Sequence, residues 1–217
     1  MTEKYICPSM MCANFDNLKD EVSKLDEAGI DIFHIDIMDG QFVPNYGMGL
    51  QDIQSIRRST NKKIDVHLMT MNPGNYIDLF VDLGVDIIYI HPESEIHPAR
   101  TLSKIKEAGK ISGIAINPGT SLSSVKDLLN LIDYLMIMTV NPGFAGQKYL
   151  DYVDEKIEEA VKLKEKYHYK IFVDGAISPE KIENLSKKGV EGFVLGTSSL
   201  FGKEKSYSEI ILELRAL

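Results

Sequence analysis

The chain has 217 residues, 26% of them charged, and a formal net charge of −8 at pH 7. Its lysines are scattered and form no basic stripe, which argues against a nucleic-acid partner. No apolar run approaches the length of a membrane span and no signal peptide is recognisable, so we expect a cytoplasmic protein without a membrane partner.

Short runs rich in β-branched residues recur along the chain and predict eight strands. They cover residues 5–9, 32–38, 64–69, 86–91, 112–117, 134–140, 169–173 and 192–195. The segments between them carry apolar residues three or four positions apart, which is typical of amphipathic helices. In the first such segment the apolar positions are Phe15, Leu18, Val22 and Leu25.

The helix after the seventh strand has clear start and stop signals. Ser178 is a favoured cap residue and Pro179 a favoured first-turn residue, while Gly189 follows the last apolar position. Strands that alternate with helices pair in parallel through right-handed crossovers, and eight such units close into a (β/α)8 TIM barrel. We therefore predict a single α/β domain over residues 1–217.

An open doubly wound sheet is the competing architecture. It usually has fewer strands and often a glycine-rich phosphate turn after the first, whereas residues 10–14 contain no glycine here. In a barrel, the chemistry lies at the carboxyl ends of the strands.

Four side chains that can bind a metal stand at or near such strand ends: His34, Asp36, His67 and Asp174. His34 and Asp36 are two positions apart on one strand, so they point to the same face. Imidazole and carboxylate together suit a divalent transition metal. Taken singly, a polar residue at a strand end is more often a satisfied hydrogen-bonding group than a ligand. Four of them, in a chain with only five histidines, favour a metal site.

Small-residue turns after strands six, seven and eight indicate a phosphate site. They cover residues 141–146, 175–177 and 196–199. Glycine lets backbone N–H groups approach an anion, and a short helix beginning at Ser198 or Ser199 would direct its positive end to the same place. The alternative is that these glycines only turn the chain. The turn from Gly143 to Gly146 is either a hinged cover over the pocket or an ordinary loop.

A metal beside two carboxylates and a phosphate site suits chemistry on a small phosphorylated ketose. The metal would act as a Lewis acid on an enediolate while one carboxylate removes the proton. Asp36 and Asp174 come from opposed strands, so they could serve the two faces of the substrate carbon. Met38, Met69 and Met138 also fall at strand ends, where thioethers could pack over the planar intermediate; simple core packing is the alternative.

Several motifs together resemble the ribulose-phosphate 3-epimerase family. They are HIDIMDGQFVPN at 34–45, DVHLM at 65–69, HPE at 91–93, MTVNPGFAGQ at 138–147 and VDG at 173–175. The resemblance runs from residue 8 to residue 201 and implies a barrel of the ribulose-phosphate binding type. It implies an isomerase that interconverts D-ribulose 5-phosphate and D-xylulose 5-phosphate.

The resemblance also implies roles for individual residues. His34, Asp36, His67 and Asp174 would bind one divalent transition metal per chain, with Zn²⁺ or Fe²⁺ ranked ahead of Mn²⁺ and Co²⁺. Asp36 and Asp174 would be the acid/base pair. Contacts to substrate and phosphate would come from Ser9, His67, Gly143, Phe144, Ala145, Gly146, Asp174, Gly175, Ala176, Gly196, Thr197 and Ser198, with Met38, Met69 and Met138 in support. Whether the chain forms a homo-oligomer stays an open question at this point.

Some positions depart from the pattern of the ribulose enzymes, so the sequence leaves open which sugar phosphate is the substrate. Ala145 and Ala176 each replace a glycine, and Met11 with Cys12 replaces a Leu-Ser pair. Several of these look like the related D-allulose 6-phosphate 3-epimerases, which form D-fructose 6-phosphate, whereas residues 91–95 and 140–142 look as much like the ribulose enzymes.

Two other classes of function remain as alternatives. A lyase or decarboxylase on this barrel would want a lysine beside the carboxylates of strands two or three, where Ile35, Ile37, Val66 and Leu68 stand instead. A non-catalytic phosphosugar-binding barrel would have no reason to keep two acids on opposite sides of a metal.

Overall fold

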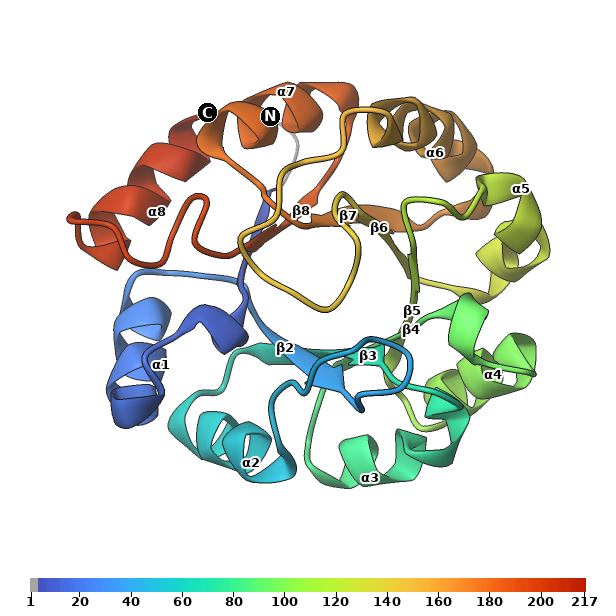
Figure 1. The fold of residues 1–217 in the computed structure, drawn as a ribbon, viewed down its shortest axis with the longest axis horizontal. Coiled ribbons are helices and arrows are strands. Elements are labelled where there is room, and N and C mark those ends of the chain that lie inside the picture. The colour runs from blue at the N-terminus through green and yellow to red at the C-terminus, as the bar shows by residue number, and fades with distance from the viewer. Residues whose placement is uncertain (1–3) are drawn as a thin grey trace.

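A computed structural model describes residues 4–217 and confirms the predicted (β/α)8 barrel (Figure 1). Eight parallel strands form one sheet in the order β1-β8-β7-β6-β5-β4-β3-β2. A parallel bridge joins Ser9, which directly follows β1, to His34 within β2. The strands are β1 (Tyr5–Pro8), β2 (Ile32–Met38), β3 (Lys63–Met69), β4 (Ile87–Ile90), β5 (Ile111–Ile116), β6 (Tyr134–Met138), β7 (Lys170–Asp174) and β8 (Gly192–Leu195).

Helices surround the strands on the outside, as Figure 1 shows. They are α1 (Leu18–Glu27), α2 (Leu50–Ser59), α3 (Ile77–Asp82), α4 (Pro98–Glu107), α5 (Leu122–Val125), α6 (Val153–Tyr167), α7 (Pro179–Lys188) and α8 (Tyr207–Ala216). Each contributes buried apolar residues to the core, for example Leu102 and Ile105 of α4, which are fully buried. Within residues 4–217, no helix combines the length and the apolar character that a membrane crossing requires.

The signals at the two ends of α7 are confirmed. The Ser178 side chain accepts a hydrogen bond from the Lys181 N–H, and Gly189 ends the helix with a φ of 110°. Phe15, in contrast, belongs to a 3-10 turn before α1 and is 47% exposed, so it does not contribute to the buried face of that helix.

The predicted short helix at Ser198 or Ser199 is wrong. Residues 197–202 form turns, in which the Gly196 carbonyl accepts hydrogen bonds from the N–H groups of Leu200 and Phe201. Gly202 then adopts a left-handed φ of 69°, which ends the turn before a helix can propagate. The backbone of this segment lies at the mouth of the barrel, but no helix N-terminus points to the pocket from it.

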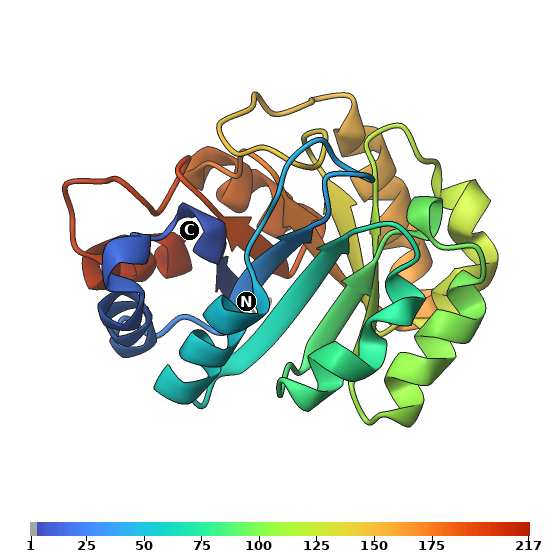
Figure 2. The same cartoon turned by 60° about the horizontal axis from the view of Figure 1, so that its bottom comes forward.

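Buried side chains fill the barrel, so its interior is a packed core and not a pore. Cys7, Tyr89, Tyr134 and Phe172 lie in this inner cluster, with the rings of Tyr134 and Phe172 stacked at a centroid distance of 4.6 Å. In Figure 2 the loops that follow β2 and β6 rise from one end of the barrel. The prediction of a single domain over residues 1–217 stays a prediction, and residues 1–3 lie outside the described part.

Candidate metal centre and pocket

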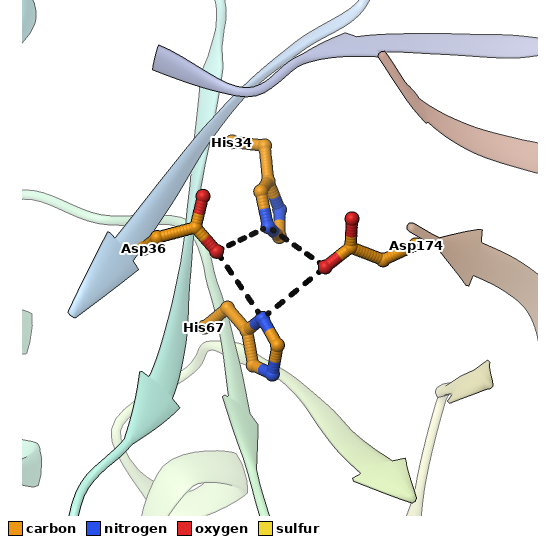
Figure 3. A group of neighbouring side chains, drawn as sticks. All are labelled: His34, Asp36, His67 and Asp174. Atoms are coloured by element: carbon orange, nitrogen blue, oxygen red, sulfur yellow. Dashed lines mark ion pairs between the residues drawn. The ribbon is translucent and has the colours of Figure 1, made fainter. Parts of the chain in front are cut away.

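The four predicted metal ligands converge at the carboxyl end of the barrel (Figure 3). His34 and Asp36 come from β2, His67 from β3 and Asp174 from β7. One ligand atom of each lies within 4.8 Å of the others. Asp36 and Asp174 occupy opposite corners of this group and the two imidazoles occupy the others.

The inner distances suit one ion in the middle of the group. His34 Nε2 lies 3.3 Å from Asp36 Oδ1 and 3.9 Å from Asp174 Oδ2. His67 Nδ1 lies 3.4 Å and 3.6 Å from the same two oxygens. Both nitrogens are buried and have no hydrogen-bond partner, a costly state for a polar atom unless something else binds it. Two nitrogens and two carboxylate oxygens fit a divalent transition metal.

Asp65, also on β3, contacts the Nδ1 atom of His34, whereas the Nε2 atom of the same ring faces Asp36 and Asp174. Its Oδ1 atom lies 2.6 Å from His34 Nδ1, and both side chains are completely buried. Burial disfavours the imidazolium, but the carboxylates of Asp65 and Asp36 outweigh it and raise the pKa of His34 well above its usual range. Sequence reasoning missed Asp65, although it stands two positions before His67 and therefore on the same strand face.

Ser9 orients the catalytic candidate Asp36. The Ser9 hydroxyl donates a hydrogen bond of 2.8 Å to Asp36 Oδ2, which leaves Oδ1 facing the two histidines. Burial alone would raise the pKa of Asp36, but the contacts with His34 and His67 lower it far below its usual range. The carboxylate is therefore charged and fixed in direction.

A further buried histidine lies behind His67. His91 follows β4, and its Nε2 atom lies 2.7 Å from His67 Nε2. Its other nitrogen, Nδ1, lies 3.5 Å from Glu93 Oε2. Burial lowers the pKa of His91 to about 4, so this ring is neutral. The sequence motif contained both residues, but nothing in their spacing predicted that they lie next to His67, a predicted metal ligand.

A pocket opens beside the metal centre and contains every predicted substrate and phosphate residue apart from His67. The residues that line it are Ser9, Met11, Cys12, Asp36, Met38, Met69, Met138, Val140, Pro142, Gly143, Phe144, Ala145, Gly146, Gln147, Asp174, Gly175, Ala176, Val194, Gly196, Thr197 and Ser198. Among the described residues, no lysine or arginine lines it. The hydrogen-bond donors that remain for an anion in this pocket are backbone N–H groups and neutral side chains such as those of Thr197 and Ser198.

The turn after β7 brings backbone into the pocket. Gly175 and Ala176 both have left-handed φ angles, of 119° and 54°, so the chain turns sharply just after Asp174. A Cβ atom on Gly175 would lie 2.5 Å from Val140 Cγ2 and 2.9 Å from Val140 N. Only glycine allows this approach.

The loops after β2 and β6 meet over the pocket. Asn45 Nδ2 donates a hydrogen bond of 2.7 Å to the Gly143 carbonyl, and Phe144 remains 50% exposed beside this contact. Figure 1 shows the loop after β6, in amber, crossing the mouth of the barrel. Met38 and Met69 form a small apolar cluster with Val43 on the same side.

We expect Gly196→Val to raise KM about 10 to 100-fold with a smaller effect on kcat. The backbone at Gly196 has room for a Cβ, whose nearest neighbour is Cys12 Sγ at 3.4 Å, so folding should survive. The γ-carbons would enter the pocket and block hydrogen bonds to a charged group, each contributing about 1.5–3 kcal/mol. Steady-state kinetics provide the measurement.

Gly49→Val is the matched control, because Gly49 lies outside the pocket, has a φ of −98° that valine can adopt, and leaves room for a Cβ, whose nearest neighbour would be Asp52 Oδ2 at 3.6 Å. Equal KM values for the two variants would contradict phosphate binding by backbone at Gly196. Gly175→Val is less informative, because its clash with Val140 would move Asp174 as well.

The sequence matches the family described as "Ribulose-phosphate 3 epimerase family" over residues 5–201. It is 37% identical over 215 residues to a chloroplastic ribulose-5-phosphate-3-epimerase of Arabidopsis thaliana, covering 97% of this chain and 76% of that protein. It is 36% identical over 211 residues to a ribulose-phosphate 3-epimerase of Bacillus subtilis (strain 168), covering 94% and 97% of the two chains.

The fold is also similar to that of a 3-keto-L-gulonate-6-phosphate decarboxylase from Vibrio cholerae O1. The TM-score is 0.74, the identity is 16%, and the match covers 99% of this chain and 97% of the other. At this identity the likeness concerns the barrel alone.

Proposed function

Since the chain belongs to the ribulose-phosphate 3-epimerase family and is an isomerase, we propose that it interconverts D-ribulose 5-phosphate and D-xylulose 5-phosphate in a metal-dependent reaction. The observation that carries the proposal is the His34, Asp36, His67 and Asp174 cluster beside a glycine-lined pocket. A phosphorylated sugar fits the family, and the names of the curated relatives favour the pentulose.

The four clustered side chains would hold one divalent ion, with Zn²⁺ or Fe²⁺ ranked ahead of Mn²⁺ and Co²⁺. When bound, the ion supplies Lewis-acid stabilisation of negative charge that develops on the substrate oxygens. Charge balance supports this proposal. A phosphate ester beside the buried carboxylate of Asp36 and the partly buried carboxylate of Asp174 needs a cation, and no lysine or arginine lines the pocket among residues 4–217.

Asp36 and Asp174 would move the proton at C3. One carboxylate removes it from its own face of the substrate, which leaves a planar enediolate, and the other acid returns a proton to the opposite face. After one turnover the two residues have exchanged protonation states. Their positions at opposite corners of the cluster support this division of labour, and Ser9 holds Asp36 Oδ2 in a fixed direction.

Backbone N–H groups of the turns after β6, β7 and β8 would bind the phosphate. The residues proposed for this contact are Gly143, Phe144, Ala145, Gly146, Gly175, Ala176, Gly196, Thr197 and Ser198. The thioethers of Met38, Met69 and Met138 would pack against the planar intermediate without offering a proton. A cytoplasmic location and a homo-oligomer stay predictions.

A comparison of kcat/KM on a pentulose and a hexulose phosphate tests the substrate. We expect ribulose 5-phosphate to exceed allulose 6-phosphate by at least about 10-fold, a difference of about 1.4 kcal/mol in transition-state binding. The reverse order would assign the chain to allulose 6-phosphate. If neither sugar takes up deuterium from solvent at C3, the chain would bind phosphosugars without catalysing their epimerisation.

A further inference from the structure

The His91 ring is buried between His67 and Glu93, with Nε2 beside His67 and Nδ1 beside Glu93. It is completely buried. Its ring stacks on His67 at a centroid distance of 4.9 Å and on Phe42, from the loop after β2, at 4.8 Å. His91 is therefore the group that contacts His67 Nε2, at 2.7 Å, away from the protein surface.

The position of the protons follows from this contact. His67 turns Nδ1 toward Asp36 and Asp174, so a metal among these residues takes the lone pair of Nδ1. The neutral ring of His67 then carries its proton on Nε2 and donates it to His91 Nε2. His91 Nε2 must therefore be the acceptor, which moves the proton of His91 to Nδ1, facing Glu93.

Glu93 is the carboxylate that faces this Nδ1 atom, and its own position is fixed by hydrogen bonds. Its Oε1 atom accepts hydrogen bonds from the Asn117 N–H at 2.8 Å and the Thr120 hydroxyl at 2.5 Å. This leaves Oε2 at 3.5 Å from His91 Nδ1, an ion-pair distance without hydrogen-bond geometry, and Nδ1 has no hydrogen-bond partner among the described residues. Lys156 in turn donates to the carbonyls of Asn117 and Pro118, which fixes the turn that holds Glu93.

We propose that His91 and Glu93 are positioning residues that keep His67 in the tautomer able to bind the metal through Nδ1. The inference rests on the metal site of the proposed function. The two metal histidines differ in this respect, because His34 has a carboxylate, Asp65, directly behind it at 2.6 Å, whereas His67 reaches its carboxylate through a second imidazole. Groups that orient a metal ligand in this way typically contribute 10 to 100-fold to metal affinity.

The test measures the Kd of zinc for the metal-free full chain by competition with a chromophoric chelator. We expect His91→Leu to weaken zinc binding about 10 to 100-fold, because leucine cannot accept the His67 N–H. His91→Gln should recover most of the affinity, because its amide oxygen can accept from His67 while its NH2 group donates to Glu93. Glu93→Ala should lose part of the zinc affinity.

Glu95→Ala is the matched control. Glu95 stands two positions further along the same loop and accepts hydrogen bonds from Gly74, His97 and Thr101, but it does not touch His91. It should leave the zinc affinity unchanged. Unchanged affinity in His91→Leu, or equal losses in His91→Leu and His91→Gln, would overturn the inference. Failure of the wild-type chain to bind zinc would instead refute the metal site of the proposed function.

Long-range ¹H–¹⁵N spectra of the zinc-loaded wild-type protein give a second, spectroscopic readout that a merely structural role would not produce. We expect His91 to show a protonated Nδ1 and an unprotonated Nε2, and His67 to show a protonated Nε2. A proton on Nε2 of His91 would overturn the proposed tautomer order even if the affinities followed the expected series.

Discussion

Replacement of Asp36 or Asp174 by asparagine should reduce kcat by about 10² to 10⁴-fold or more. Asparagine keeps the size of the side chain and one oxygen that can bind a metal, but it removes the group that transfers the proton. Metal content, measured on each variant, separates loss of proton transfer from loss of the ion. Asp151→Asn is the control, because Asp151 is 84% exposed on the loop after β6 and forms a surface ion pair with Lys181.

The two variants should also differ from one another. If each acid serves one face, the Asp36→Asn protein still exchanges solvent deuterium into C3 of one epimer without inverting it, and Asp174→Asn does so only with the other epimer. Each remaining carboxylate can remove and return a proton only on its own side. Exchange into both epimers by both variants would show that another base acts, and the two-aspartate mechanism would be abandoned.

Most of the site could be predicted because residues two positions apart on a strand point to the same face. His34 and Asp36 are two residues apart on β2, which places them on one face whatever the rest of the fold does. The barrel architecture then brings the ends of β3 and β7 to the same mouth, so His67 and Asp174 could be predicted without knowledge of any distance.

The supporting contacts needed the three-dimensional structure. The bond from Asn45 to Gly143 joins residues 98 positions apart, and it depends on how two loops fold over the mouth. His91 reaches His67 because β3 and β4 pair with His67 opposite Tyr89, two positions before His91. Strand register of this kind is not encoded in any local pattern, since each strand alone fits several registers.

The predicted helix at Ser198 failed for a local reason. A serine after a glycine-rich turn is a good cap signal, but a helix also needs propagation over several turns. Here Gly202 follows within one turn, and residues 203–206 contain three charged residues before α8 begins at Tyr207. The cap signal therefore marks a turn whose first residues, Thr197 and Ser198, line the pocket.

The purified protein should contain about one divalent transition metal per chain, and His67→Ala should lose it while remaining folded. His67 is one of the two predicted nitrogen ligands. Burial lowers the pKa of its neighbour His91 to about 4, so His91 is neutral and removal of His67 leaves no buried charge without a partner on that side. Metal content by elemental analysis, together with thermal unfolding of the metal-free forms, provides the measurement. Full metal content in His67→Ala would contradict the site.

His34→Ala should also lose the metal, but at a cost in stability. It leaves the completely buried carboxylate of Asp65 without its partner, and breaking a buried pair costs about 3–5 kcal/mol. We therefore expect a lower Tm for His34→Ala than for His67→Ala, both without metal. The same Tm for the two variants would mean that Asp65 is protonated or finds another partner.

Metal binding should also depend on pH in a defined direction. In the metal-free protein, burial opposes the charged form of His67, but its contacts with Asp174 and Asp36 outweigh burial and raise its pKa, and the pKa of His34 is raised further. Protons and metal compete for the same nitrogens, so zinc affinity should fall as pH decreases through these raised pKa values, and binding should release protons. Calorimetric titrations in two buffers of different ionisation enthalpy measure that release. Binding with no proton release, at a pH below the raised pKa of both histidines, would show that the metal does not replace protons on His34 and His67, and the ligand set would have to be drawn from other residues.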